Sequence, residues 1–142
     1  MFEMTEIAAV AASVDEVWAD LTDASRLAAW IWPARFETEA VVEPVELGRW
    51  EVRSSVADLA VLGRVTAIEP PHRLRLEWRW EGEQHATDAE LTLESAADAS
   101  TRLTVRHTGF LSDDERVSHV EGWTNCLQRL VDRHGGAPGA TL

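Results

Sequence analysis

Apolar and polar side chains alternate strictly over residues 74–83, LRLEWRWEGE. Leu74, Leu76, Trp78 and Trp80 occupy every second position, with Arg and Glu between them. Successive side chains on a pleated strand point to opposite faces, so this pattern predicts a strand with one apolar and one solvated face. Two neighbouring indoles make that face wider than a thin core needs. We therefore expect it to line a space, with plain core packing as the equal alternative.

Five further runs of period two flank this strand, and short turns join all six. They are FETEAVVE (36–43), GRWEVRSS (48–55), VLGRVTAIE (61–69), ATDAELTLES (86–95) and STRLTVRHTGF (100–110). In the first of them Phe36 shares a face with Ala40 and Val42. A parallel crossover needs a dozen or more residues, so these short connections predict one antiparallel sheet.

Helical signals stand before and after the predicted sheet. A capping box at Ser13 and Glu16 predicts a short helix from about residue 14, after an opening strand over residues 3–10. A second short helix begins near Asp23 or Ser25 and stops before Pro33.

Residues 113–134 return to helical spacing and predict one long amphipathic helix. Its apolar positions are Val117, Val120, Trp123, Leu127, Leu130 and Val131. The apolar face of the sheet and the stripe of this helix must bury each other, which predicts an α+β fold with a curved antiparallel sheet wrapped around the helix. Such a sheet rarely closes everywhere, and the gap is a natural pocket for an apolar ligand. We expect a single domain over residues 1–142, with a core over about 5–134 and a flexible tail over 135–142.

Composition narrows the possible partners. With 142 residues and a net charge of −12, the chain opposes phosphate backbones and anionic lipid surfaces, so neither nucleic acid nor membrane insertion is expected. Acidic residues near the start argue against a secretory signal, so we expect a cytoplasmic protein. We also expect a monomer or a homodimer. Cys126 is the single cysteine, and the five histidines lack paired ligand spacing, so no metal site is expected. Glycine-rich phosphate cradles are absent, and no cofactor is expected.

Several segments together resemble a known family. They are ASVDEVWADLTDASRLAAWIWP, LGRWEVR, GRVTAIEPPHRLRLEW, STRLTVRHTGF and GWTNCLQRLVDR. The chain resembles the family related to the C-terminal domain of the activator of the Hsp90 ATPase, within the START/SRPBCC superfamily, over about residues 5–134. The resemblance implies the helix-grip fold of the birch-pollen allergen and a cavity protein: a carrier, a polyketide cyclase or aromatase, or a self-sacrificing resistance protein. Leu47-Gly48 stands where the family usually has Gly-Gly, so we expect that turn to differ locally.

Candidate pocket residues follow from the inward face of each predicted element. They are Trp32, Phe36, Trp50, Val52, Ser54, Trp78, Trp80, Leu91, Val105, His107, Val120, Trp123 and Leu127. Residues i and i+2 of a helix point apart, so Trp30 and Trp32 cannot both be buried on one helical face, and we expect one of them to cap the cavity mouth. Trp123 is expected to pack in the core where Gly122 permits a close approach.

His107 shares its face with Leu103 and Val105, where a buried core histidine is the more common role. Its functional alternatives are to orient a ligand through a hydrogen bond or to act as a general base, which makes it a weak catalytic candidate. A nucleophilic Ser54–His107 pair has no identifiable acidic partner.

The leading hypothesis is a protein that binds an apolar or aromatic small molecule between the sheet and the C-terminal helix. A polyketide cyclase-like or aromatase-like enzyme using the same cavity is the alternative, and a chaperone-related interaction module is a further one. The sequence leaves all three open.

Overall fold

The computed structural model describes residues 2–136, which form seven strands, three α-helices and one short 3-10 helix. The elements are β1 (Phe2–Val10), α1 (Val14–Thr22), α2 (Ala24–Trp30), η1 (Ala34–Phe36), β2 (Glu39–Val42), β3 (Arg49–Ser54), β4 (Leu59–Glu69), β5 (Arg73–Trp78), β6 (Thr87–Ala96), β7 (Ser100–Phe110) and α3 (Asp113–Arg133). Of the predicted tail, residues 137–142 lie outside the described residues.

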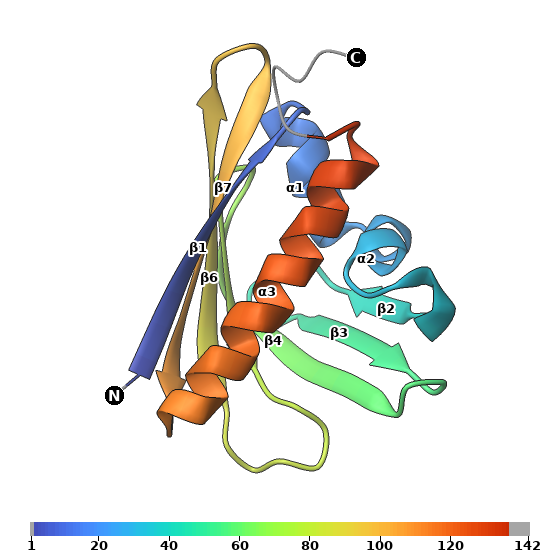
Figure 1. Cartoon of the computed structure of the whole chain (residues 1–142), viewed down its shortest axis with the longest axis vertical. Helices are drawn as coiled ribbons and strands as arrows, with labels where there is room; N and C mark the ends of the chain where they lie inside the picture. Colours follow the sequence, from blue (N-terminus) through green and yellow to red (C-terminus); the bar gives the residue numbers. More distant parts are fainter. Residues whose placement is uncertain (1, 137–142) are drawn as a thin grey trace.

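All seven strands form one antiparallel sheet in the order β1-β7-β6-β5-β4-β3-β2. The long helix α3 crosses one face of the sheet, with β1, β7 and β6 on one side of it and the β3–β4 arm on the other (Figure 1). Helices α1 and α2 lie beside the C-terminal part of α3. The predicted fold class, a curved antiparallel sheet around a C-terminal helix, is confirmed.

The alternation in β5 separates the two faces of the sheet as the sequence predicts. Leu74, Leu76 and Trp78 are buried, while Arg73 and Arg75 lie on the outer face. There they form ion pairs with carboxylates of β6, such as Arg75 with Asp88 at 2.9 Å. Solvated pairs of this kind each contribute little to stability. The outer face is therefore a charged, solvated surface, and the buried face provides the core.

Side-chain caps fix where each helix begins. The Ser13 hydroxyl accepts a hydrogen bond from the Glu16 N–H at 3.2 Å, and the Ser112 hydroxyl does the same for Glu115 at 3.1 Å. The Asp23 carboxylate caps α2 through the Ser25 N–H at 3.0 Å. These bonds satisfy N–H groups that have no partner within the helix. The three predicted helices are confirmed.

The prediction of a strand starting at Phe36 is wrong. Phe36 ends the 3-10 turn that follows Pro33, and Glu37 adopts a left-handed backbone with φ of 51° before β2 starts at Glu39. Pro33 stops α2 as expected, but the chain needs this extra turn before it can enter the sheet. Phe36 instead packs against Trp32, with ring centroids 6.3 Å apart.

Trp30 and Trp32 are both buried, with 2% and 9% of their surface exposed, but they do not share a helical face. Helix α2 ends at Trp30, and the i, i+2 spacing of a helix no longer applies beyond it. The Trp30 indole donates to the main-chain carbonyl of Asp20 at 2.9 Å. Trp32 is thus free to point in a direction that a continued helix would forbid.

A buried carboxylate joins α1 to both other helices. Asp20 is fully buried, and its Oδ1 accepts hydrogen bonds from Arg26 Nε at 3.1 Å and from Arg133 Nε at 3.2 Å. Its Oδ2 lies 2.6 Å from Nε2 of His134, just after α3. One anion therefore holds α2 and the C-terminal end of α3 against α1.

We expect Asp20→Asn to lower the free energy of unfolding by about 3 kcal/mol, because it leaves the partner cations without their anion. Urea unfolding monitored by tryptophan fluorescence would measure this. Glu94→Gln is the control, because Glu94 pairs with Arg102 on the exposed outer face and its loss should cost less than about 0.5 kcal/mol. Equal effects of the two substitutions would contradict the assigned role of Asp20.

In the turn before β3, a residue other than glycine adopts a left-handed backbone. Leu47 adopts a left-handed backbone with φ of 67°, a region that disfavours side chains with a Cβ atom. Its N–H donates to the carbonyl of Val65 at 2.7 Å, which fixes the backbone there. At Gly48 a Cβ atom would come within 2.1 Å of the Glu43 carbonyl oxygen. Gly48 is therefore required, and Leu47 stands in a strained position.

Leu47→Gly is expected to stabilise the protein by about 0.5–1 kcal/mol, because it removes the left-handed strain from an exposed position. Thermal unfolding would show a higher Tm. Leu47→Ala keeps a Cβ atom and the strain, so it should not reproduce the gain. A Leu47→Gly variant no more stable than Leu47→Ala would show that the turn carries no such strain.

Candidate functional site

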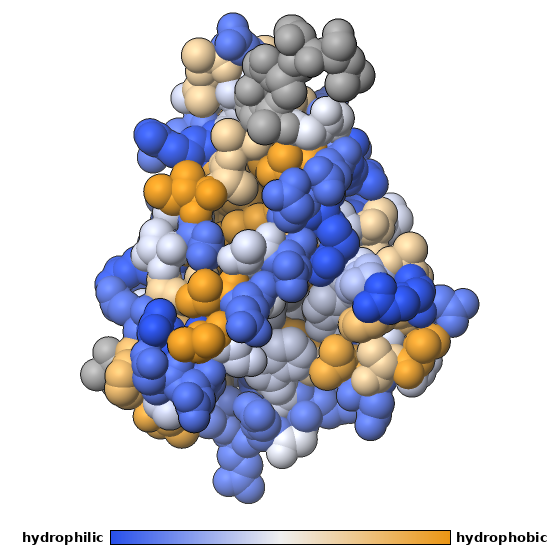
Figure 2. All heavy atoms as spheres, in the orientation of Figure 1, coloured by the Kyte–Doolittle hydropathy of each residue, from blue (hydrophilic) through white to orange (hydrophobic). Residues whose placement is uncertain are grey.

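A pocket of about 390 Å³, open to solvent on one side, lies between the N-terminal half of α3 and the sheet. Its wall comes from four parts of the chain: the segment after α2, the start of β4, the end of β5 with the loop that follows, and α3. The lining residues are Ile31, Trp32, Leu59, Trp78, Trp80, Glu83, Glu115, Ser118, His119, Gly122, Trp123 and Cys126. In Figure 2, pale side chains show between α3 and the β3–β4 arm, with blue polar side chains around them.

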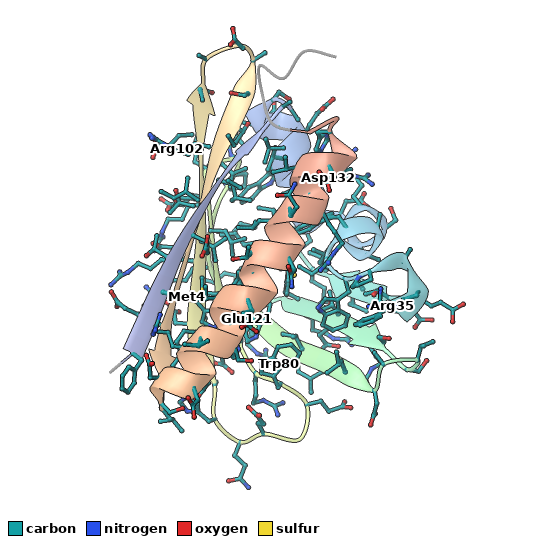
Figure 3. All side chains as sticks on the ribbon, viewed as in Figure 1. Met4, Arg35, Trp80, Arg102, Glu121 and Asp132 are labelled. Carbon is teal, nitrogen blue, oxygen red and sulfur yellow. The ribbon has the colours of Figure 1, made fainter. Side chains whose placement is uncertain are left out.

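Four of the seven tryptophans line this pocket: Trp32, Trp78, Trp80 and Trp123. Trp78 is central, with ring centroids 5.2 Å from Trp123 and 6.0 Å from Trp80. The ring planes of Trp32 and Trp80 are nearly parallel, 10° apart, with centroids separated by 6.4 Å. Trp80 lies beside the N-terminal half of α3 (Figure 3). The indoles thus present wide aromatic surfaces to whatever occupies the pocket.

A hydrogen-bonded chain behind the pocket fixes Trp123 and His107. The Trp123 indole N–H donates to His107 Nδ1 at 3.0 Å, so the ring proton of His107 sits on Nε2 and donates to the Thr87 hydroxyl at 2.6 Å. The Thr87 hydroxyl donates in turn to the Trp78 carbonyl at 3.3 Å. His107 is fully buried, and both of its ring nitrogens are engaged. It does not line the pocket, and its contacts are those of a residue that positions Trp123.

His119 is the imidazole that does line the pocket. Its Nδ1 donates to the Glu115 carbonyl at 2.8 Å, and its Nε2 accepts the indole N–H of Trp80 at 3.0 Å. Both nitrogens are therefore engaged here too, and the ring holds Trp80 in place. Sequence reasoning considered His119 only as a metal ligand. Its i, i+4 spacing from Trp123 on one face of the helix was the signal that could have identified it.

Two other side chains that could act as nucleophiles are also engaged in hydrogen bonds. The Cys126 thiol donates to the Ile31 carbonyl at 2.9 Å, and burial raises its pKa to about 11, so it remains a protonated thiol at neutral pH. The Ser54 hydroxyl donates to the Phe36 carbonyl at 2.6 Å. Since Thr87 and Trp123 take both nitrogens of His107, Ser54 and His107 do not form a nucleophilic pair.

The structure divides the thirteen residues predicted for the site into three groups. The pocket wall contains four of them, Trp32, Trp78, Trp80 and Trp123. Fully buried away from the wall are Trp50, Val52, Ser54, Leu91, Val105, His107 and Leu127. Partly buried against the core are Phe36 and Val120. Alternation gives the face on which a side chain lies, but the inner face extends well beyond the pocket.

Gly122 has a different role from the one expected. A Cβ atom added there would meet nothing within 4 Å, so the glycine does not permit a close approach of another element. It lines the pocket instead, and its missing side chain leaves room there. Glycine in a helix costs about 1 kcal/mol relative to alanine. Gly122 therefore lowers the stability of the helix and leaves open space in the pocket.

Two further findings concern the part of the chain that the structure describes. Within residues 2–136 no three His, Cys, Asp or Glu side chains converge as metal ligands would. In the same residues no helix combines the length and apolar character that crossing a bilayer requires.

The helix that lies across the curved sheet and the open pocket beneath it define a helix-grip fold of the START/SRPBCC class. Residues 11–135 match the family described as Activator of Hsp90 ATPase homolog 1-like protein, and the chain belongs to this family. The resemblance inferred from the sequence motifs is therefore confirmed. No curated protein matches the chain at a significant level of sequence similarity.

Solved structures with the same fold include CalU16 from Micromonospora echinospora, which is 27% identical with a TM-score of 0.74 over 96% of this chain and 76% of CalU16. DynU16, from the dynemicin biosynthetic locus, is 24% identical with a TM-score of 0.78 over 92% of this chain. The chain spans only 46% of the length of DynU16. An HSP90 activator from Plasmodium falciparum is 17% identical with a TM-score of 0.73, over 89% of this chain and 91% of that one.

The buried His107 predicts a specific dependence of stability on pH. Burial, with a smaller electrostatic contribution from His119, lowers the pKa of His107 from 6.5 to about 3. Between these values the unfolded chain binds a proton that the folded protein does not, so stability is lost as the pH falls below 6.5. From pH 7 to pH 5 this contribution is about 2 kcal/mol.

Urea unfolding of the wild type and of His107→Gln at both pH values would isolate this effect, because the other titrating groups are common to both proteins. The variant is expected to lose about 2 kcal/mol less than the wild type between pH 7 and pH 5. A His107 ring signal that titrates near pH 6.5 in NMR spectra of the folded protein would contradict the prediction.

Proposed function

We propose that this protein binds an apolar or aromatic small molecule in the pocket between α3 and the sheet. The observation that carries the proposal is the set of four indoles around a pocket of about 390 Å³, a volume within the range of small-molecule sites. A ligand that buries roughly 200 Å² of apolar surface there gains about 5 kcal/mol, from which ordering costs are subtracted. A binding free energy of this order corresponds to a ligand that binds reversibly.

One polar group in the wall has no partner. The Trp78 indole N–H is buried and has no hydrogen-bond partner among the described residues. A buried unsatisfied donor costs about 1–3 kcal/mol. Since this nitrogen is itself buried, the contact that Trp78 offers to a ligand is the surface of its ring.

Binding is better supported than the cyclase-like or aromatase-like alternative. Catalysis by proton transfer needs a group at the pocket wall that is free to take up or release a proton. The hydrogen bonds of His119 occupy both of its ring nitrogens, and His107 lies behind the wall with a pKa near 3. The Cys126 thiol remains protonated at neutral pH. The two carboxylates that line the pocket, Glu83 and Glu115, lie at its solvated mouth, away from the tryptophans of the interior. The engaged groups shape and stiffen the pocket, which is what a binding protein requires.

The chaperone-related alternative has a different basis. It rests on the family description and on a likeness of fold to the Plasmodium activator at 17% identity. Neither involves the pocket, whereas the tryptophans around the pocket make direct contact with any guest. We therefore place small-molecule binding first.

Gly122→Leu tests the proposal by filling the pocket without cutting into the core. The leucine side chain enters open space beside the tryptophans, and leucine is a better helix former than glycine. We expect the free energy of unfolding to rise or stay unchanged and the affinity for an apolar fluorescent probe to fall at least tenfold. Quenching of tryptophan emission and isothermal calorimetry would measure the affinity.

Gly122→Ala is the matched control, because it improves the helix while adding only one methyl group. It should retain most of the affinity and gain about 1 kcal/mol in stability. Probe binding by Gly122→Leu at wild-type strength would place the binding site elsewhere. A broad apolar library that leaves the wild-type Tm and emission unchanged would remove the proposed function altogether.

A further inference from the structure

The charged side chains that line the pocket carry one sign. Glu83, from the loop after β5, and Glu115, from the first turn of α3, are its only charged lining residues among those described, and both are acidic. Glu83 is exposed and Glu115 is half-buried, so both belong to the wet mouth of the pocket. The tryptophans form the drier part of the wall. The pocket thus has an apolar interior and an anionic rim.

An adjoining hollow extends the same pattern. It has a volume of about 310 Å³ and shares Leu59, Trp80 and Glu83 with the pocket. Its other charged lining residues are Asp58 and Glu81, which are acidic too. The described residues therefore line both hollows with carboxylates and with no arginine side chain.

The nearby arginines neutralise the carboxylates of the two hollows only in part. Arg53 pairs with the Glu81 carboxylate, and Arg79 donates to the main-chain carbonyl of Glu83 at 3.2 Å. Neither guanidinium bonds to the carboxylates of Asp58, Glu83 or Glu115. A net charge of −12 on the whole chain reinforces the negative potential at the mouth. An anionic guest would meet repulsion here, and a cationic one would meet attraction.

The tryptophans favour the same charge. An indole face carries the negative part of the ring quadrupole and attracts a cation within about 6 Å of its centre. Trp80 lines both hollows, so its ring borders the acidic mouth. We propose that the ligand is an amine, an inference that rests on the proposed function. Its aromatic or apolar body is held among the indoles, and its positive charge lies at the mouth near Glu83 and Glu115.

Three probes that share one ring and differ in charge test this assignment: naphthylmethylamine, naphthylmethanol and naphthoate. Calorimetry with the wild type should show the amine binding roughly tenfold tighter than the alcohol, with naphthoate weakest. The preference for the amine should shrink at high salt, because the mouth is solvated. Gly122→Leu should abolish binding of all three probes, which would assign the preference to the pocket.

Glu83→Gln combined with Glu115→Gln removes both charges but keeps the side-chain length and an acceptor oxygen. It should reduce the ratio of amine to alcohol affinity to about twofold and leave the alcohol affinity unchanged. Glu121→Gln removes an exposed charge of α3 that does not line the pocket, and it should keep the wild-type ratio (Figure 3).

The possible outcomes separate the two proposals. Equal affinities for amine and alcohol, tightest binding of naphthoate, or a ratio that survives in the double variant would overturn the amine assignment while leaving the pocket as a binding site. If none of the three probes binds to the wild type, both the assignment and the proposed function are overturned.

Discussion

The site depends on the contact between the buried face of β5 and one face of α3, where indole rings meet across the interior. Trp78 comes from the strand and Trp123 from the helix, with ring centroids 5.2 Å apart. Two imidazoles fix the neighbouring rings, since His107 accepts from Trp123 and His119 accepts from Trp80. Rings held by hydrogen bonds at their edges cannot collapse into the open space beside them. Two of the four indoles in the pocket wall, Trp80 and Trp123, are therefore fixed to the scaffold, which opposes collapse of the pocket.

Local pattern was sufficient to predict the architecture. The period-two runs predicted the strands, and the capping residue Ser13 marked where the first helix begins. Burial on one face and solvation on the other is a property of neighbouring residues, so it can be read from short segments. Local pattern is insufficient where the chain leaves regular structure. Trp32 lies beyond the end of α2 and Phe36 ends a 3-10 turn, and neither geometry follows from periodicity.

The pocket itself could be predicted only in part, because it is defined by what the side chains leave empty. Trp50 and Trp78 lie on the same face of the sheet, yet Trp50 donates its indole N–H to the Leu21 carbonyl at 3.0 Å and belongs to the core. The hydrogen bond of Trp50 to α1 depends on how α1 packs against the sheet, which the sequence pattern does not give. His119 and Gly122 were missed as pocket residues because their importance comes from the space that they face.

A single α3 position without a side chain has a consequence for how this fold can change. Gly122 borders the pocket but touches no neighbouring element, so a substitution there alters the dimensions of the pocket and little else. Trp78 and Trp123 of the same wall also belong to the buried core, where resizing a side chain disturbs folding. Gly122 carries no such second duty. Selection could therefore retune the size of the pocket in single steps at this position, with stability rising as the space narrows.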